Sequence, residues 1–383
     1  PVYTGQRSAE TADRPVAGKS IGMSDAVEHA LRFNPGLGAQ EAESRSSEEG
    51  RKSARGAFGP RLGVSYSATK TESKRDPSAT MGTKNPKMGV YSWGVEVTQP
   101  IFQGFRLLST YQKAALQADS DKASLRKAEL DMTEQVQTAF LEYLKAGENT
   151  RSMRDSLTRL REQLRIAQAY FEVGLSPRLD VLQAEVDVSE AESLLIEAEN
   201  TQATALAKLN TLLGFDATAV NTYTGTLKEV GFRYTLEQCL ELAYRQRPDL
   251  YVAQKAVEIA RKSQKEVQSD YYPQIEGYYS MTQSGNTPGM QRSGENGSHV
   301  TNWEVGAQAT WNVFEWGTTY YADKQAGWQV TKMRYEQENL KLEVGYDIKS
   351  KYLAVQEARK RIAVAQNSVA QATEAYNVAL ARY

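Results

Sequence analysis

Few side chains in this chain of 383 residues are of the types that catalysis or metal binding requires. The two histidines, His29 and His299, lie in different kinds of segment without a matching Cys or His cluster, so a metal site is not expected. The single Cys239 excludes an internal disulfide and a cysteine-based metal cluster. No nucleophile, base and orienting group form a recognisable constellation. The sequence therefore predicts a protein that is not an enzyme and that uses no cofactor or metal.

Composition and charge narrow the class of protein further. The 46 basic and 47 acidic residues are mixed along the chain and leave a net charge of −1, so no nucleic-acid partner is expected. A mean hydropathy of −0.58 and long stretches rich in Ala, Gln and Glu favour long helices over a thick globular core. No run of about 18 apolar residues predicts a transmembrane helix. The amino terminus lacks the pattern of an export signal, which is expected to have been removed.

The chain repeats itself at an offset of 212 or 213 residues. Proline, phenylalanine and glycine recur in the same order, which two unrelated amphipathic helices would not produce. The matched positions are Pro35 and Pro248, Pro60 and Pro273, Phe102 and Phe314, Gly104 and Gly317, and Phe140 and Tyr352. The sequence therefore predicts a duplicated unit.

Each copy changes from helical to strand periodicity and back. Residues 1–22 form an amino-terminal extension without periodicity, residues 23–231 the first repeat and residues 232–383 the second. In the first repeat we expect two short helices, strands at about 61–70 and 89–102, and helices at about 104–171 and 177–213. In the second we expect the same short helices, strands at about 273–283 and 301–314, and a helix at about 317–383.

The four predicted strands alternate apolar and polar residues. In the first hairpin the apolar positions are Leu62, Val64, Tyr66 and Ala68, followed by Tyr91, Trp93, Val95 and Val97. Long polar loops at residues 71–88 and 283–300 and aromatic residues near strand ends are typical of outer-membrane strands. A soluble hairpin with one face on a core has the same alternation. The strands alone leave both interpretations open.

The helix predicted after Gly104 is too long for a globular domain of this size, because 68 residues at 1.5 Å each give a rod of roughly 100 Å. A coiled-coil seam is predicted at Met153, Leu157, Leu160, Leu164, Ala167 and Phe171. A turn at Gly174-Leu175-Ser176-Pro177 leads into a shorter returning helix. Because residues 36–57 have close to the missing length, we expect the two shorter helices to stack end to end beside the long one.

The order of hairpin, long helix, tight turn and returning helix, present twice, resembles the TolC-like outer membrane factor family. The segments that carry the resemblance are residues 99–104 (QPIFQG), 170–174 (YFEVG), 180–185 (DVLQAE) and 311–317 (WNVFEWG). Asn312 stands where the family often has Pro. Each motif is weak alone, but their order and spacing match the family from about Ile21 onward.

The resemblance implies a mixed α and β membrane protein that assembles as a homotrimer in the outer membrane. Three chains of four strands form a 12-stranded β-barrel, which a long α-helical barrel continues through the periplasm. This duct is passive: an inner-membrane transporter supplies energy and a periplasmic adaptor contacts the helical tips, for which we expect Val173, Gly174, Leu175 and Ser176. The expected lumen-facing residues are Glu96, Glu276 and Glu304, and the expected membrane-facing aromatics are Trp93, Trp303 and Trp311.

The function within this architecture is not decided by the sequence. Export of small molecules from the periplasm and inner-membrane transporter is the leading hypothesis, and a type I protein secretion channel is the alternative with the same architecture. A soluble coiled-coil scaffold is the alternative of another class. Tyr383 corresponds to Phe171 at an offset of 212, so the second copy is expected to lack its returning helix, and the periplasmic gate residues are not assigned.

Overall fold

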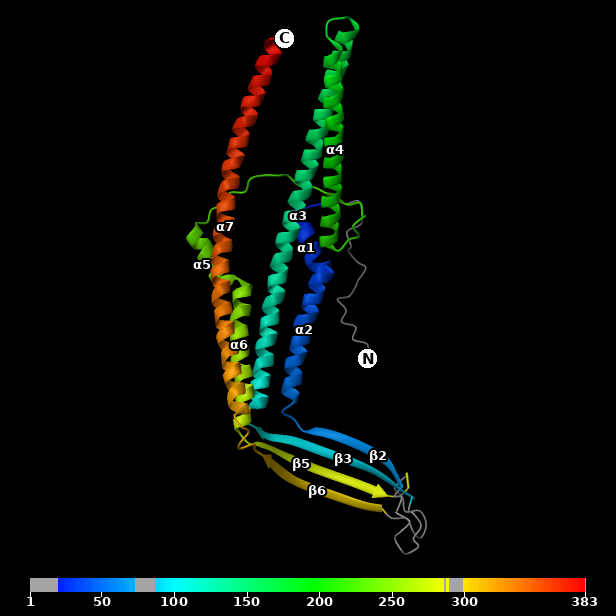
Figure 1. Ribbon diagram of the computed structural model, residues 1–383, viewed down its shortest axis with the longest axis vertical. Helices are drawn as coiled ribbons and strands as arrows, with labels where there is room; N and C mark the ends of the chain where they lie inside the picture. The colour runs from blue at the N-terminus through cyan, green and yellow to red at the C-terminus, as the bar shows by residue number, and fades with distance from the viewer. Residues whose placement is uncertain (1–19, 73–86, 286, 289–298, 383) are drawn as a thin grey trace. The chain divides into compact units, whose positions relative to one another are not determined.

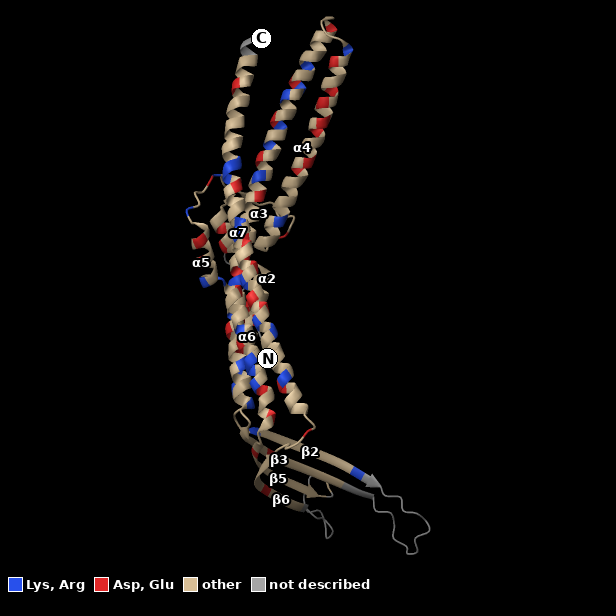
Figure 2. Ribbon diagram, turned by 60° about the vertical axis from the view of Figure 1, so that its left-hand side comes forward, with Lys and Arg blue, Asp and Glu red and all other residues tan. Residues whose placement is uncertain are grey.

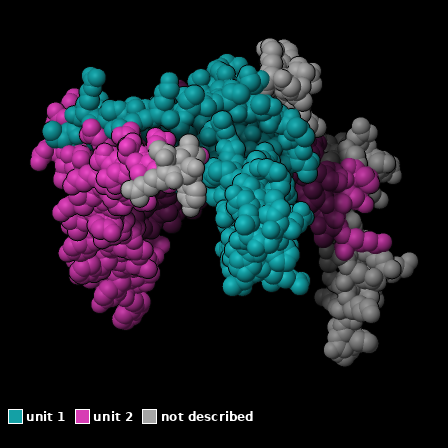
Figure 3. All heavy atoms as spheres, turned by 90° about the horizontal axis from the view of Figure 1, so that it is seen from above, with its two compact units in different colours: residues 1–43, 124–235 teal, residues 44–123, 236–383 magenta. Residues whose placement is uncertain are grey.

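The computed structural model describes residues 20–72, 87–285, 287–288 and 299–382. The chain divides into two compact units, coloured separately in Figure 3. Unit 1 comprises residues 1–43 and 124–235, and unit 2 comprises residues 44–123 and 236–383. The units do not follow the repeats, because the sheet of unit 2 contains strands from both copies. Most of the predicted extension, the centres of both predicted loops and Tyr383 lie outside the described residues.

Helices make up most of both units (Figure 1). The first repeat contains α1 (Met23–Phe33), α2 (Pro35–Gly56), α3 (Arg106–Glu172) and α4 (Arg178–Leu213). The second contains α5 (Leu236–Gln246), α6 (Pro248–Gln268), the short helix η1 (Ser269–Tyr271) and α7 (Thr318–Arg382). None of the described helices is long and apolar enough to cross a membrane. The described residues also contain no cluster of His, Cys, Asp or Glu that could hold a metal ion.

The core of unit 1 lies where α1, α3 and α4 meet. Phe140, Leu209 and Leu213 are fully buried there among small residues of α1 and α3. The core also includes Ile21, which belongs to strand β1 (Ser20–Ile21) and pairs in parallel with β4 (Thr222–Tyr223). The last residues of the predicted extension are thus part of the folded unit. Burial raises the pKa of Tyr223 to about 12.

Two features of unit 1 agree with the predicted helix packing. The seam of α3 is confirmed at Leu157, Leu160 and Leu164, which form a cluster with residues of α4. The beginning of α2 meets the end of α4, since the Asn34 side chain donates to the Leu212 carbonyl at 2.9 Å. Asn34 also accepts hydrogen bonds from the first backbone amides of α2, so one side chain joins the two helix ends.

Unit 2 contains a four-stranded antiparallel sheet in the order β2-β3-β5-β6. The strands are β2 (Arg61–Glu72), β3 (Lys87–Gln103), β5 (Gln274–Gly285) and β6 (His299–Thr310). The two hairpins are joined by pairing of β3 with β5, with a bulge between Pro100 and Phe102. Figure 2 shows few charged residues on the strands, whereas both signs of charge are spread along the helices.

Strand β6 ends at Thr310, before the predicted end at residue 314. Thr310 pairs with Gln274, where the partner strand β5 begins, so residue 311 has no strand residue to pair with, and the following side chains bond elsewhere. The Trp311 indole donates to the Tyr271 carbonyl at 3.2 Å, and Asn312 donates to Glu315 at 2.6 Å. The prediction followed alternation alone, which does not reveal where pairing stops.

Each strand-to-helix junction contains two consecutive residues with positive φ. They are Gly104 and Phe105 before α3, and Trp316 and Gly317 before α7. By conformation Gly104 therefore corresponds to Trp316, at an offset of 212, and not to Gly317 at 213 as the sequence comparison suggested. The two glycines occupy successive positions of the same left-handed turn. The offset is 213 up to the first strand of each hairpin and 212 afterwards.

Candidate functional site

The sheet of unit 2 has an apolar face. Trp93 pairs with Tyr66 on one side and with Gln283 on the other. Directly opposite residues point to the same side of a sheet, so these side chains share a face. Trp303 lies on this face too, because it pairs with Met281. The large apolar and aromatic residues that the described chain leaves exposed here include Leu62, Val64, Tyr66, Tyr279, Trp303 and Val305.

The opposite face is polar. Glu96 pairs with Gly63 and with Ser280, and Ser280 pairs in turn with Glu304. Glu96 and Glu304 therefore belong to one cross-strand row with Ser280 between them. Glu276 lies on the same face, opposite Gln308. The structure thus places the three carboxylates singled out from the sequence on one face of the sheet, with Glu96 and Glu304 in one row and Glu276 four residues along β5 from it.

Tyr278 is a polar-face residue that the sequence analysis did not single out. Its hydroxyl donates to the Glu304 carboxylate at 2.6 Å. The ring covers Gly306, where an added Cβ would lie 2.8 Å from the Tyr278 hydroxyl oxygen. Glycine at 306 therefore makes room for the tyrosine. The position of Tyr278 in the polar register of the strand was the available signal.

Trp311 differs from the other two tryptophans, since it follows the end of β6. Trp311 begins the connection to α7 and is exposed, but its indole N–H donates to the carbonyl of Tyr271, the last residue of η1. An indole with an apolar body and one satisfied polar group suits a boundary between apolar and polar surroundings.

The turn between α3 and α4 forms a second candidate site, in unit 1. The Leu175 amide donates to the Tyr170 carbonyl at 2.8 Å and the Gly174 amide to the Phe171 carbonyl at 3.0 Å. This pair of bonds is a Schellman motif, which places its glycine in the left-handed region, and the φ of Gly174 is +76°. An added Cβ at Gly174 would meet no atom within 4 Å. Only the backbone conformation, not crowding, favours glycine there.

The surface of this turn is apolar. Val173, Leu175 and Leu179 are all strongly exposed. The Ser176 hydroxyl oxygen is buried and has no hydrogen-bond partner among the described residues. The structure therefore collects the four predicted tip residues into one small, mostly apolar turn.

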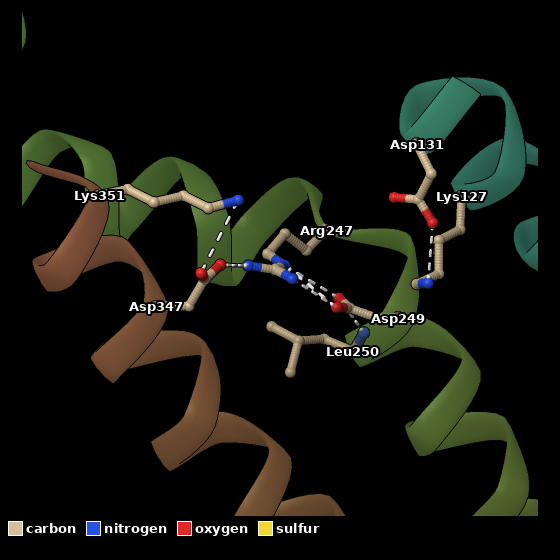
Figure 4. A network of polar contacts seen from close by, with 7 residues as sticks. All are labelled: Lys127, Asp131, Arg247, Asp249, Leu250, Asp347 and Lys351. Carbon is tan, nitrogen blue, oxygen red and sulfur yellow. Dashed lines mark hydrogen bonds and ion pairs between the residues drawn. The ribbon is translucent and has the colours of Figure 1, made fainter. Parts of the chain in front are cut away.

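The junction between α5 and α6 carries a charged network, shown in Figure 4. Arg247 forms ion pairs with Asp249 at 2.8 Å and with Asp347 of α7 at 3.0 Å. The hydrogen bond to Asp249 holds the pKa of the Arg247 guanidinium above its ordinary value. Lys127 and Asp131, also drawn, form a separate pair within α3 at 2.9 Å. The pair of Arg247 with Asp347 joins the α5–α6 junction to α7, and the residues drawn show no arrangement typical of catalysis.

The chain is similar in sequence to proteins of one known family. The sequence model of a family described as outer membrane efflux protein matches residues 26–215 and 239–383. The alkaline protease secretion protein AprF of Pseudomonas aeruginosa is 26% identical over 83% of this chain and 66% of its own length. The outer membrane protein TolC of Vibrio cholerae is 24% identical over 79% of this chain and 67% of its own. The chain thus spans about two thirds of the length of these relatives.

Solved structures share the fold. The outer membrane protein VceC of Vibrio cholerae superposes with a TM-score of 0.77 at 16% identity, over 94% of this chain and 85% of that one. The CmeC outer membrane channel of Campylobacter jejuni gives a TM-score of 0.70 at 17% identity, over 84% and 68%.

Proposed function

This chain belongs to the outer membrane efflux protein family, and we propose that three copies of it form a passive exit duct for small molecules in a tripartite efflux system. The resemblance to TolC-like outer membrane factors is confirmed, as is a location in the outer membrane with an extension into the periplasm. The family consists of channels. In the proposed system an inner-membrane transporter supplies the energy, and a periplasmic adaptor connects it to the duct.

The observation that carries the proposal is the two-faced sheet. One face exposes Val64, Trp303 and Val305, and the other carries Glu96 and Glu304. An apolar face suits lipid and a polar face suits a water-filled lumen. Four strands are too few for a closed barrel, and unpaired strand edges cannot face lipid. Three copies give 12 strands, which is within the range of outer-membrane barrels.

Nothing in this proposal requires a chemical step. The carboxylates of Glu96, Glu276 and Glu304 line the water path and raise the local concentration of cations. Trp93 and Trp303 face the lipid, and Trp311 lies at the level where the barrel meets the helices. The energy for export comes from the transporter, so the duct needs only to stay open and to be wide enough.

Conductance through a planar lipid bilayer tests the duct. We expect the purified protein to form stable, water-filled pores that prefer cations over anions. Replacing all three carboxylates, as in Glu96→Gln with Glu276→Gln and Glu304→Gln, should lower this preference. Val95→Thr changes the opposite face and should leave it unchanged. Absence of pores from correctly inserted protein would falsify the proposal, and pores whose ion preference ignores the carboxylates would refute the lumen assignment.

The turn between α3 and α4 is the proposed contact for the adaptor. Its small apolar surface lets another helical hairpin approach closely, and Gly174 adds no side chain to block it. The double change Gly174→Glu and Leu175→Arg should abolish capture of the cognate adaptor while trimers persist. The matched control is Ile196→Ala, an exposed apolar residue in the middle of α4 and away from the turn, which should retain full binding. Full capture of the adaptor by the double variant would show that the turn between α3 and α4 is not part of the adaptor interface.

Protein secretion is the second candidate, favoured by the similarity to AprF, which is a secretion protein by name. The same duct would serve both functions, because the partner transporter selects the substrate. Deleting the gene and measuring drug susceptibility and secreted proteins in parallel separates the two. The soluble coiled-coil scaffold is not supported, since the chain is an outer membrane protein of a channel family.

A further inference from the structure

A pocket of about 500 Å³ lies in unit 2 where α3 and α6 reach the sheet (Figure 1). The first two turns of α3 and the last two turns of α6 form its sides, and η1 with the residue after it completes the wall. This volume is within the range of pockets that bind small ligands. The function proposed above makes no use of this pocket.

The pocket carries positive charge without a counter-charge. Lys262 and Lys265 both line it, and none of its lining residues is acidic. Lys262 donates to the neutral Gln112 side chain at 2.7 Å. Lys265 is exposed and makes no hydrogen bond or ion pair with any other residue that the structure describes. Two ammonium groups in one pocket attract an anion.

The carboxylates next to the pocket are already paired with other cations. Glu266 forms an ion pair with Lys113 at 2.5 Å and accepts a hydrogen bond from Thr110 at 3.0 Å. Asp270 forms an ion pair with Arg106. Neither carboxylate therefore neutralises the two lysines of the pocket.

The groove between α3 and α6 continues away from the sheet into a second pocket of about 410 Å³. This second pocket shares both lysines and adds Arg261, but it is also lined by Asp119 and Glu258. Charges of both signs thus occur further along the helices. The end of the groove next to the sheet is its most positive part.

The corresponding junction of the first repeat lacks this charge. At an offset of 213, Lys262 corresponds to Glu49 of α2 and Lys265 corresponds to Lys52. Glu49 and Lys52 form an ion pair with each other at 2.7 Å. The duplicated unit can therefore have balanced charge at these two positions, and the second repeat does not.

The pocket borders the apolar face of the sheet. Phe102 lies opposite Ile275, which belongs to the row of β5 that forms this face. The centre of the Phe102 ring is 5.3 Å from that of Phe105 and 6.5 Å from that of Tyr272. Phe105 and Tyr272 are exposed and line the pocket. An aromatic cluster therefore joins the apolar face to the two lysines.

We propose that this pocket binds the phosphate headgroup of an anionic phospholipid from the periplasmic leaflet of the outer membrane. The phosphate lies between Lys262 and Lys265, and the acyl chains lie along Phe105 and the apolar face. This inference rests on the proposed duct, in which the apolar face meets lipid. The junction of the sheet with the periplasmic helices is then at the level of the headgroups.

The surroundings of the lysines favour this ligand over two others. A free phosphate would gain nothing from the exposed rings of Phe105 and Tyr272, whereas acyl chains bury apolar surface against them. A zwitterionic headgroup carries an ammonium or trimethylammonium group, which finds no carboxylate in the pocket. The combination of two unpaired cations with an aromatic border therefore suits a lipid with net negative charge.

Native mass spectrometry of the full-length protein in a neutral detergent tests the site. Phosphatidylglycerol and phosphatidylcholine with the same acyl chains are titrated separately, and phosphatidylglycerol should bind more tightly. Each lysine near an anionic lipid contributes about fivefold in affinity. Lys265→Gln should therefore weaken phosphatidylglycerol binding about fivefold and Lys262→Gln with Lys265→Gln about 25-fold. Binding of phosphatidylcholine should not change.

Two further variants separate charge in the pocket from charge elsewhere. Lys349→Gln with Lys360→Gln removes the same charge from exposed positions of α7 and should leave lipid binding unchanged. Lys262→Arg with Lys265→Arg keeps the charge and should keep most of the binding. The oligomer seen in the same spectra shows whether a variant is folded. Lys265→Gln alters an exposed side chain without a partner, so it tests the site even if the double variant does not fold.

The soluble headgroup glycerophosphoglycerol distinguishes a lipid from a free phosphate. It should bind far more weakly than phosphatidylglycerol, and equal affinity would overturn the assignment of a lipid. Phosphatidylglycerol binding that ignores Lys265→Gln, or that falls equally in the α7 control, would overturn the pocket.

The bilayer conductance described above tests the duct independently. Cation-preferring pores together with equal affinity for the two lipids would overturn this site and leave the duct standing. Absence of pores together with equal affinity would overturn both.

Discussion

The two repeats place the same kind of residue in different surroundings. Leu157 of α3 packs against α4 and is 6% exposed. Val369 of α7, at an offset of 212, is 66% exposed, since no returning helix lies against it in the described part of the chain. Both residues fit a seam pattern. Periodicity therefore predicts which face of a helix is apolar enough to pack against another helix. Whether that face is buried depends on whether such a helix is present.

The junctions before the second helix of each repeat also differ. In the first, Asn34 bonds to the end of α4 and to the start of α2 without carrying charge. In the second, Arg247 occupies the same position and forms ion pairs with Asp249 and Asp347. One position of the duplicated unit thus joins helices by neutral hydrogen bonds in one copy and by charge in the other.

The largest expected difference between the repeats is at their matched aromatic residues. Phe140→Ala removes a fully buried ring from the core of unit 1 and should cost about 3–5 kcal/mol. Tyr352→Ala removes a half-buried ring at the equivalent position of α7 and should cost roughly half as much. Hydrogen exchange of the amides around each site measures the local loss. Equal losses at both sites would contradict the difference in packing.

The second-largest expected difference is in the stability lost when glycine is replaced at the left-handed turn of each repeat. An alanine in this conformation costs about 1–2 kcal/mol. Gly104→Ala should cost more than that, because its Cβ would also clash with the Ser269 carbonyl oxygen. Gly317→Ala should cost close to the conformational amount, since its nearest contact is the edge of the Tyr321 ring at 3.2 Å.

Gly59→Ala serves as the control for these two variants. Gly59 has no positive φ, and an added Cβ meets only an ordinary contact at 3.5 Å. The thermal stability of the three variants should therefore fall in the order Gly59→Ala, Gly317→Ala, Gly104→Ala. Equal stability for the two turn variants would argue against tight packing at the first junction.

The smallest expected difference concerns salt. Asn34→Ala should cost about 1 kcal/mol at any ionic strength, because it removes a neutral cap. Arg247→Ala should cost up to about 1 kcal/mol at low salt and less in high salt, since partly exposed ion pairs are screened. Protection of the α2 and α6 amides, measured at two salt concentrations, checks both. If both variants showed the same salt dependence, the claim that neutral hydrogen bonds hold one junction and ion pairs hold the other would be contradicted.

Local patterns predicted much of the fold. Alternation in residues 61–70 predicted which strand residues share a face, and the heptad spacing predicted the contacts of Leu157 and Leu164 with α4. Gly174, followed two residues later by Ser176-Pro177, predicted the turn at the tip. Each of these features depends on residues close together in the chain, so periodicity and turn chemistry are sufficient.

Long-range contacts were not predictable in the same way. The pairing of Ile21 with Tyr223 involves a two-residue strand that has no periodicity. The hydrogen bond of Trp311 just after β6 depends on a carbonyl 40 residues away in the chain. Tyr278 could be placed on the polar face by alternation, but its bond to Glu304 depends on the register of two strands.

The sequence by itself determined the duplication, the order of the elements, the two faces of the sheet and the site of the tip, because these follow from local spacing. Only the tertiary structure decided that β3 joins β5, that α3 lies against α6, and that β2 and β6 are the open edges. The physical reason is that local spacing determines which face of a helix or strand is apolar. Which other element packs against that face depends on contacts between residues that lie far apart in the chain.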